Sequence, residues 1–137
     1  MLARGRQRSL RAALSTAAGM LVGLCAARLA VRWLDVAEVM GRSMSPALEP
    51  GDLLLVERLT YRRRLPRVGE IALARDPRLP HRELVKRVAA VEAGIVSLRG
   101  DNTAASTDSA TFGAVPLLAV RWRARFRYWP PSRVGPI

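Results

Sequence analysis

The stretch Glu83-Leu84-Val85-Lys86-Arg87-Val88 contains the only lysine of this chain; all the other basic residues among its 23 lysines and arginines are arginines. The two side chains differ because a desolvated ammonium can lose its proton, whereas a guanidinium cannot. If residues 84–90 form a strand, one apolar face is shared by Leu84, Lys86, Val88 and Ala90. Desolvation on that face would lower the pKa of the amine toward the range of a general base. The alternative is that Lys86 merely replaced an arginine by neutral drift and lies at a solvent-exposed edge of the sheet.

A candidate nucleophile lies in the stretch Met40-Gly41-Arg42-Ser43-Met44-Ser45-Pro46. Gly41 permits a tight backbone approach beside Ser43. Ser45 precedes a proline, which favours an extended backbone and makes it the weaker candidate. Gly-x-Ser alone is a weak signal. Together with the single lysine it predicts a Ser-Lys dyad, which is a recognised variant of the serine acyl-transfer machinery.

An uncharged apolar segment occupies residues 12–27 and follows four arginines. It is short for a bilayer span, but Arg28 and Arg32 can snorkel and let residues 29–34 complete one. A cleavable signal peptide and a buried soluble helix are the alternatives. We expect a basic cytoplasmic N-terminus at 1–11 and a single transmembrane anchor at 12–34, with the rest of the chain outside the plasma membrane.

Charge and rare residues exclude several classes of function. The net charge is +12, but six arginines and no acidic residue fall within residues 1–34, so basicity alone does not predict a nucleic-acid partner. Cys25 is the only cysteine, which excludes an intrachain disulfide and a cysteine metal site. His81 is the only histidine and is expected at the surface, and a site of several histidines is excluded.

The rest of the sequence is typical of a β protein. Glu49-Pro50-Gly51-Asp52 predicts a type II turn, and residues 62–64 a polar loop. The long polar segment 102–113 is expected to be a functional loop. In the last strand, the apolar and aromatic residues should face the core. The four arginines that alternate with them, from Arg121 to Arg127, should face the solvent. Strands are expected at 53–59, 71–74, 84–91, 95–98 and 120–128.

Five stretches, in this order, resemble the signal peptidase I family of membrane-anchored serine proteases. The resemblance runs from about Val39 to the C-terminus and implies a Ser-Lys peptidase domain at 39–137. The matching stretches are Gly41-x-Ser43-Met44-x-Pro46, Pro50-Gly51-Asp52-Leu53, Gly69-Glu70-Ile71, Leu84-Val85-Lys86-Arg87-Val88, and Gly100-Asp101-Asn102 with Ser106-Thr107-Asp108-Ser109.

The resemblance implies a mainly β fold, in which a coiled antiparallel sheet is preceded in the chain by one N-terminal transmembrane helix. It implies that Ser43 attacks the scissile carbonyl and that neutral Lys86 takes its proton. Ser106 would orient Lys86, and Asp108 would stabilise the loop that contains Ser106. No metal or cofactor is expected, and the partners are a protein or peptide with a signal or leader segment and the lipid bilayer. Contact with the substrate is expected from Met40, Met44, Leu84 and Val85.

The chain departs from the family pattern at several positions. Ala110 replaces the usual arginine, which leaves the role of Asp108 open, and Ala47 stands where threonine is frequent. Gly41 replaces a serine that some members use in the oxyanion hole, so backbone N–H groups, including that of Ser43, must suffice.

Three other functions stay open. The small size and the Tyr128-Trp129-Pro130-Pro131 ending also resemble proteases that remove the leader of nickel-type superoxide dismutase. A non-catalytic, membrane-tethered basic binding module would need neither Ser43 nor Lys86. A soluble self-cleaving regulator is disfavoured by the anchor and by the absence of a DNA-binding helical domain.

Overall fold

The computed structural model describes residues 3–105 and 114–137. The chain forms two compact units, Met1–Trp33 and Leu34–Ile137. The first contains helix α1 (Ala3–Trp33). Within it, the 20 residues Leu14–Trp33 have a mean hydropathy of 1.7, so by length and composition this segment could cross a bilayer.

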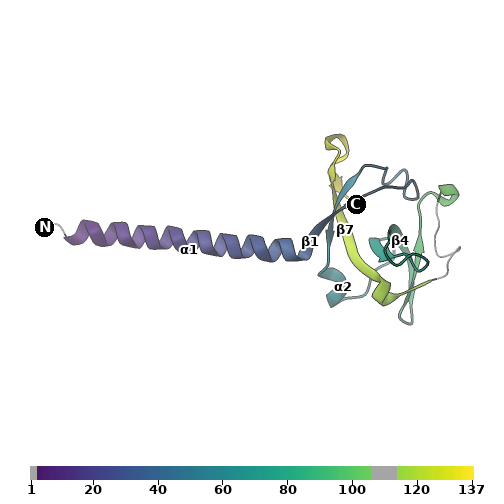
Figure 1. The fold of residues 1–137 in the computed structure, drawn as a ribbon, viewed down its shortest axis with the longest axis horizontal. Helices are drawn as coiled ribbons and strands as arrows, with labels where there is room; N and C mark the ends of the chain where they lie inside the picture. The colour runs from purple at the N-terminus through teal and green to yellow at the C-terminus, as the bar shows by residue number, and fades with distance from the viewer. Residues whose placement is uncertain (1–2, 106–113) are drawn as a thin grey trace. The chain divides into compact units, whose positions relative to one another are not determined.

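The second unit is one curled antiparallel sheet in which β7 lies between β2 and β3 (Figure 1). This confirms the predicted fold class. The strand order is β1-β2-β7-β3-β4-β5-β6, and β8 pairs with β7. The strands are β1 (Leu34–Glu38), β2 (Leu53–Glu57), β3 (Ile71–Arg75), β4 (Glu83–Glu92), β5 (Ile95–Arg99), β6 (Val115–Pro116), β7 (Val120–Trp129) and β8 (Gly135–Pro136). The short helices are α2 (Thr60–Arg63), η1 (Thr103–Ala105), η2 (Leu117–Ala119) and η3 (Pro131–Arg133).

All five predicted strands are present, with ends that differ by up to two residues. Three were not predicted: β1, β6 and β8. Two of these have only two residues each, too short for a pattern. β1 follows the helix directly and is defined by its pairing with β2 from Leu34 to Glu38. The predicted loop at residues 62–64 is wrong in part, because α2 includes Arg62 and Arg63.

The predicted turn before β2 is confirmed. The Asp52 N–H donates a 3.0 Å hydrogen bond to the Glu49 carbonyl, and Gly51 has a φ of +89°. A type II turn requires that positive φ at its third residue, and glycine adopts it without steric cost.

Both faces of β3 are buried, which explains its continuous apolar sequence. Ile71 and Leu73 belong to a core cluster with Met44 and Leu48. The alternate residues belong to a second cluster, where Ala72 and Ala74 pack with Val88, Val96, Leu98, Val115 and Val120. The segment that contains Ser43 and the strand that contains Lys86 therefore adjoin a common central strand.

The predicted faces of the last strand are wrong at two positions. Tyr128 is 39% exposed instead of buried, and the Arg127 side chain is only 14% exposed. The pairing of β2 with β7 shifts register between Leu53 and Leu54 and again between Leu55 and Val56. Each shift interrupts the two-residue alternation, so the strict pattern in the sequence does not persist along the strand.

Candidate active site

Ser43 lies in a loop that closes on itself between β1 and β2. The Val39 N–H donates to the Asp52 carbonyl at 2.9 Å, and the Gly51 N–H donates to the Val39 carbonyl at 2.8 Å. Between these ends, Met44 and Leu48 insert into the first core cluster and are 1% and 0% exposed. The residue after Ser43 is therefore an anchor in the core, which fixes the loop beside the serine.

A buried carboxylate holds the other half of this loop. Asp52 is 1% exposed and accepts a 3.0 Å hydrogen bond from the Glu49 N–H. Arg127 and Arg133 approach the same carboxylate at 3.2 and 3.3 Å. Both arginines also donate to the Ala47 carbonyl, at 2.8 and 3.4 Å. Residues from the C-terminal part of the chain thus stabilise the loop that contains the candidate nucleophile.

Ser45 is engaged elsewhere, because its hydroxyl donates a 2.8 Å hydrogen bond to the Glu49 carboxylate. The space beside Gly41 is open: a Cβ added there would meet no atom within 4 Å among the described residues. Gly41 therefore leaves room for the tight backbone approach that it permits, and no described residue fills that space.

Lys86 lies in the middle of β4 and is 3% exposed. It pairs in register with Ala72 of β3, which is fully buried. The neighbours on its face, Leu84 and Val88, are 7% and 1% exposed, which confirms the predicted apolar face over these three residues. Ala90 is only half-buried, because the pairing of β4 with β5 shifts register after Val88.

Two contacts connect the turn after β5 to these segments. The Asn102 N–H donates a 2.9 Å hydrogen bond to the Ser43 carbonyl. Arg87, next to the lysine, forms a two-pronged ion pair with Asp101 at 2.8 and 2.6 Å. The third contact of this arginine is a 2.8 Å hydrogen bond to the Gly69 carbonyl. Four of the five stretches singled out in the sequence are therefore connected by these contacts.

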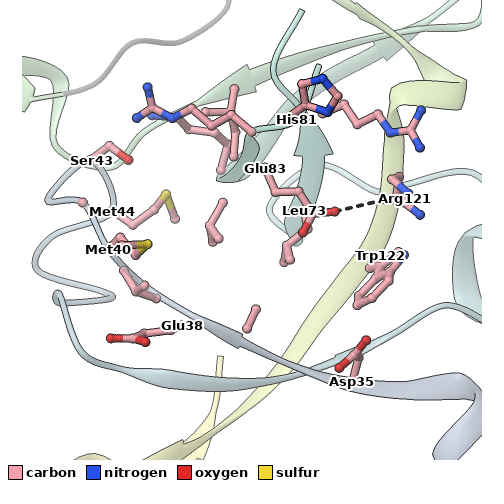
Figure 2. A pocket seen from close by; sticks show the side chains of 18 of the residues that line it. Asp35, Glu38, Met40, Ser43, Met44, Leu73, His81, Glu83, Arg121 and Trp122 are labelled. Atoms are coloured by element: carbon pink, nitrogen blue, oxygen red, sulfur yellow. Dashed lines mark hydrogen bonds and ion pairs between the residues drawn. The ribbon is translucent and has the colours of Figure 1, made fainter. Parts of the chain in front are cut away.

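Ser43 and Lys86 line one cavity of about 950 Å³ in the second unit. Figure 2 shows this cavity with Ser43 labelled at its border. Leu73 and Trp122 also line it, from β3 and β7. Of the expected substrate contacts and supporting residues, the cavity is lined by Met40, Gly41, Met44, Leu84 and Val85. Ser106 and Asp108 lie outside the described residues, although Ala105, directly before them, lines the cavity.

The sequence did not predict that Trp122 lines the cavity. Arg58 stacks over its ring at 4.2 Å from the centroid and also pairs with Asp35 at 3.5 Å. A cation over an aromatic face stabilises the ring in its orientation. Glu83 and Arg121 form a 3.1 Å ion pair at the same cavity, drawn as a dashed line in Figure 2.

The candidate site contains no arrangement for a metal ion among the residues described. Within residues 3–105 and 114–137, no three histidine, cysteine, aspartate or glutamate residues are grouped closely enough to hold one. His81 is exposed and lines the cavity, as expected for its position at the surface.

Comparison with known proteins assigns the class. The family model described as signal peptidase, peptidase S26, matches residues 11–99. The chain is 33% identical to the mitochondrial ATP-independent inner membrane protease subunit 1a of Arabidopsis thaliana, over 82% of this chain and 81% of that protein. It is 31% identical to the mitochondrial inner membrane protease subunit 1 of Xenopus tropicalis, over 82% and 80%. A probable thylakoidal processing peptidase of Arabidopsis thaliana is 27% identical over 69% of this chain and 38% of its own length.

The fold and these matches place the chain among the serine peptidases. More narrowly, it belongs to the signal peptidase family, peptidase S26.

Proposed function

We propose that this chain is a membrane-anchored serine endopeptidase that removes signal or leader peptides, with Ser43 as nucleophile and Lys86 as general base. The observation that supports the proposal most directly is that both residues line one cavity while Lys86 is 3% exposed. Burial disfavours a charged amine, so the lysine is suited to act in its neutral form.

In the proposed reaction, the neutral amine of Lys86 takes the hydroxyl proton of Ser43 as Oγ attacks the scissile carbonyl carbon. The carbonyl oxygen becomes an oxyanion, which accepts hydrogen bonds from backbone N–H groups such as that of Ser43. Collapse of the tetrahedral intermediate breaks the C–N bond, and the lysine ammonium gives its proton to the leaving amine.

The acyl-enzyme then reacts with water. Lys86 takes a proton from the water as its oxygen attacks the ester carbonyl. The second tetrahedral intermediate expels the Ser43 oxygen, which recovers the proton from the lysine. The leader leaves with a new carboxylate, and both side chains return to their starting forms.

Apolar residues around the pair suit a peptide substrate. Met40, Met44, Leu84 and Val85 supply apolar lining, and segments of β1 and β4 both border the cavity. Ser106 and Asp108 keep the roles that the family resemblance implies, orientation of the lysine and bracing of the loop.

We also propose that Leu14–Trp33 anchors the enzyme in the plasma membrane with a cytoplasmic N-terminus. Support comes from the hydropathy of this segment and from the arginines that precede it. Reporter fusions after residue 40 and after Ile137 should both report the outside. A cytoplasmic signal from either fusion would contradict this topology.

The activity is tested with two serine variants. Ser43→Ala should abolish cleavage and leave thermal unfolding unchanged. Ser45→Ala is the matched control and should keep most activity, because its hydroxyl is bonded to Glu49. The reverse pattern would show that Ser43 is not the nucleophile.

N-terminal proteomics of cells with and without the Ser43→Ala change would then count the substrates. Many altered N-termini indicate a general signal peptidase, and a single one a dedicated maturation protease.

A further inference from the structure

The cavity that contains Ser43 and Lys86 is bordered by several arginines, of which some are already paired. Arg78 contacts the buried Asp76 at 3.2 Å, and Arg121 pairs with Glu83. The guanidinium groups of Arg78 and Arg121 are therefore neutralised by carboxylates of the protein itself.

Three further arginines line the same cavity and are exposed: Arg42, Arg75 and Arg82. Within residues 3–105 and 114–137, no carboxylate lies within ion-pair distance of these three side chains. Cationic groups gathered at a cleft attract anions to it and raise their local concentration.

The backbones of these arginines are fixed. Arg75 ends β3 opposite Glu83 in the register of β4. The Arg82 carbonyl accepts a 2.9 Å hydrogen bond from the Asp76 N–H, and its own N–H donates to the Leu79 carbonyl at 2.8 Å. Arg75 and Arg82 thus come from the two sides of one connection, which leads directly into the lysine strand, and Arg42 adjoins Ser43.

We propose that Arg75 and Arg82, with Arg42 beside the nucleophile, select peptide substrates that have an acidic side chain near the scissile bond. This inference rests on the proposed function and names the substrate class of the same site. A carboxylate is the group that an arginine binds through two parallel hydrogen bonds. A peptide is favoured over an anionic lipid headgroup because the arginines line the cavity that the reacting carbonyl must enter.

The test uses full-length protein in neutral detergent and a series of cleavable peptides. In this series, each position within four residues of the scissile bond is changed singly from Asn to Asp. At one or more positions, Asp should raise kcat/KM about fivefold over Asn, as for partly exposed ion pairs, and the gain should shrink with added salt. The double variant Arg75→Glu/Arg82→Glu should lose the gain and favour Lys at those positions.

Two variants control for overall charge. Arg63→Glu and Arg99→Glu change exposed arginines that are not among the cavity-lining residues, and they should keep the preference for Asp. Equal cleavage of Asp and Asn peptides by the wild type would overturn the proposal. So would a loss of preference that the control variants share.

Two further measurements distinguish peptide selection by the arginines from failure of the proposed function and from lipid binding. Peptide binding to the Ser43→Ala protein, followed by fluorescence anisotropy, tests the arginines without cleavage, whereas cleavage of the Asn peptides tests the proposed function. Vesicles of phosphatidylcholine with and without phosphatidylglycerol test the lipid. If the Arg75→Glu/Arg82→Glu variant loses activity only on phosphatidylglycerol, whatever the peptide charge, the arginines bind lipid and the proposal is wrong.

Discussion

The backbone N–H of Asn102 donates its hydrogen bond to the carbonyl oxygen of Ser43 at 2.9 Å. The turn that follows β5 therefore contacts the peptide unit of the candidate nucleophile directly. The same turn is held to β4 through the pair of Asp101 with Arg87, the residue after the lysine. One turn thus fixes the backbone on the serine side while remaining attached to the lysine strand.

Asn102→Pro tests this contact, because proline has no N–H to donate. We expect kcat to fall at least about tenfold, since small displacements of a nucleophile are costly in rate. Asn102→Ala is the control: it keeps the N–H and loses only the side-chain acceptor of a 3.3 Å bond from Ala105. Steady-state kinetics on one peptide measures both, and an equal loss of kcat in the two variants would contradict the role of the N–H.

The buried lysine predicts a pH profile and a substitution pattern. Because only the neutral amine can act as a base, the rate should rise with pH and level off below the ordinary lysine value of ~10.4. Lys86→Arg retains the charge but cannot release the proton, so activity should fall by orders of magnitude, nearly as far as in Lys86→Ala. Near-normal turnover of Lys86→Arg would exclude the general-base role. Circular dichroism of both variants checks that the fold is retained.

The Asp52 carboxylate should be a large contributor to stability. Asp52→Ala leaves the side chain of Arg127, 14% exposed, without its carboxylate partner, and loss of one member of a buried pair costs about 3 kcal/mol or more. Asp35→Ala is the matched control, since its pair with Arg58 is exposed and should contribute less than about 1 kcal/mol. Denaturant unfolding measures both. A similar small effect of the two changes would show that the Asp52 contacts do not hold the serine loop.

Glu70 predicts a dependence of stability on acid. Burial would raise the pKa of this carboxyl, but the hydrogen bond from Arg64, the N–H of Arg67 and the charge of Arg123 outweigh it and lower the pKa. A carboxyl with a lowered pKa in the folded state stabilises the fold above its unfolded value of 4.5, and this stabilisation is lost as the pH falls through the folded pKa.

The wild type should therefore lose stability below about pH 4.5, and Glu70→Gln should be less stable at pH 7 with a flatter profile. The difference between the two proteins should narrow as the pH falls. Glu92→Gln, which changes an exposed residue at the end of β4, is the control and should follow the wild type. Urea unfolding at several pH values measures the difference, and a constant gap across the range would contradict the prediction.

Local patterns predicted β2, β3, β4, β5 and β7 and the apolar face around Lys86, because a two-residue period and burial act on neighbouring positions. They failed for Arg127, where register shifts between β2 and β7 turn a predicted solvent-facing residue toward Asp52. They also missed β1, whose five residues are defined by pairing with β2 and not by a pattern of their own.

The composition of the cavity was only partly accessible from sequence. Ser43 and Lys86 could be proposed from a motif and from the scarcity of lysine. The places of Trp122, Arg75 and Arg82 at the cavity could not, because they depend on how β3, β4 and β7 come together. Their side chains resemble those of any amphipathic surface strand until the tertiary contacts are known.

The presence of a single, buried lysine makes the protein unusually accessible to spectroscopy. Isotope-labelled lysine would introduce one side-chain signal into the whole chain, so its chemical shift would report the protonation of that amine during a titration without any substitution. Lys86 and the N-terminus are the only amines that an acylating reagent can convert to stable amides, and the low exposure of Lys86 predicts slow modification until the fold opens. The rate of that modification would then report opening of the sheet around β4.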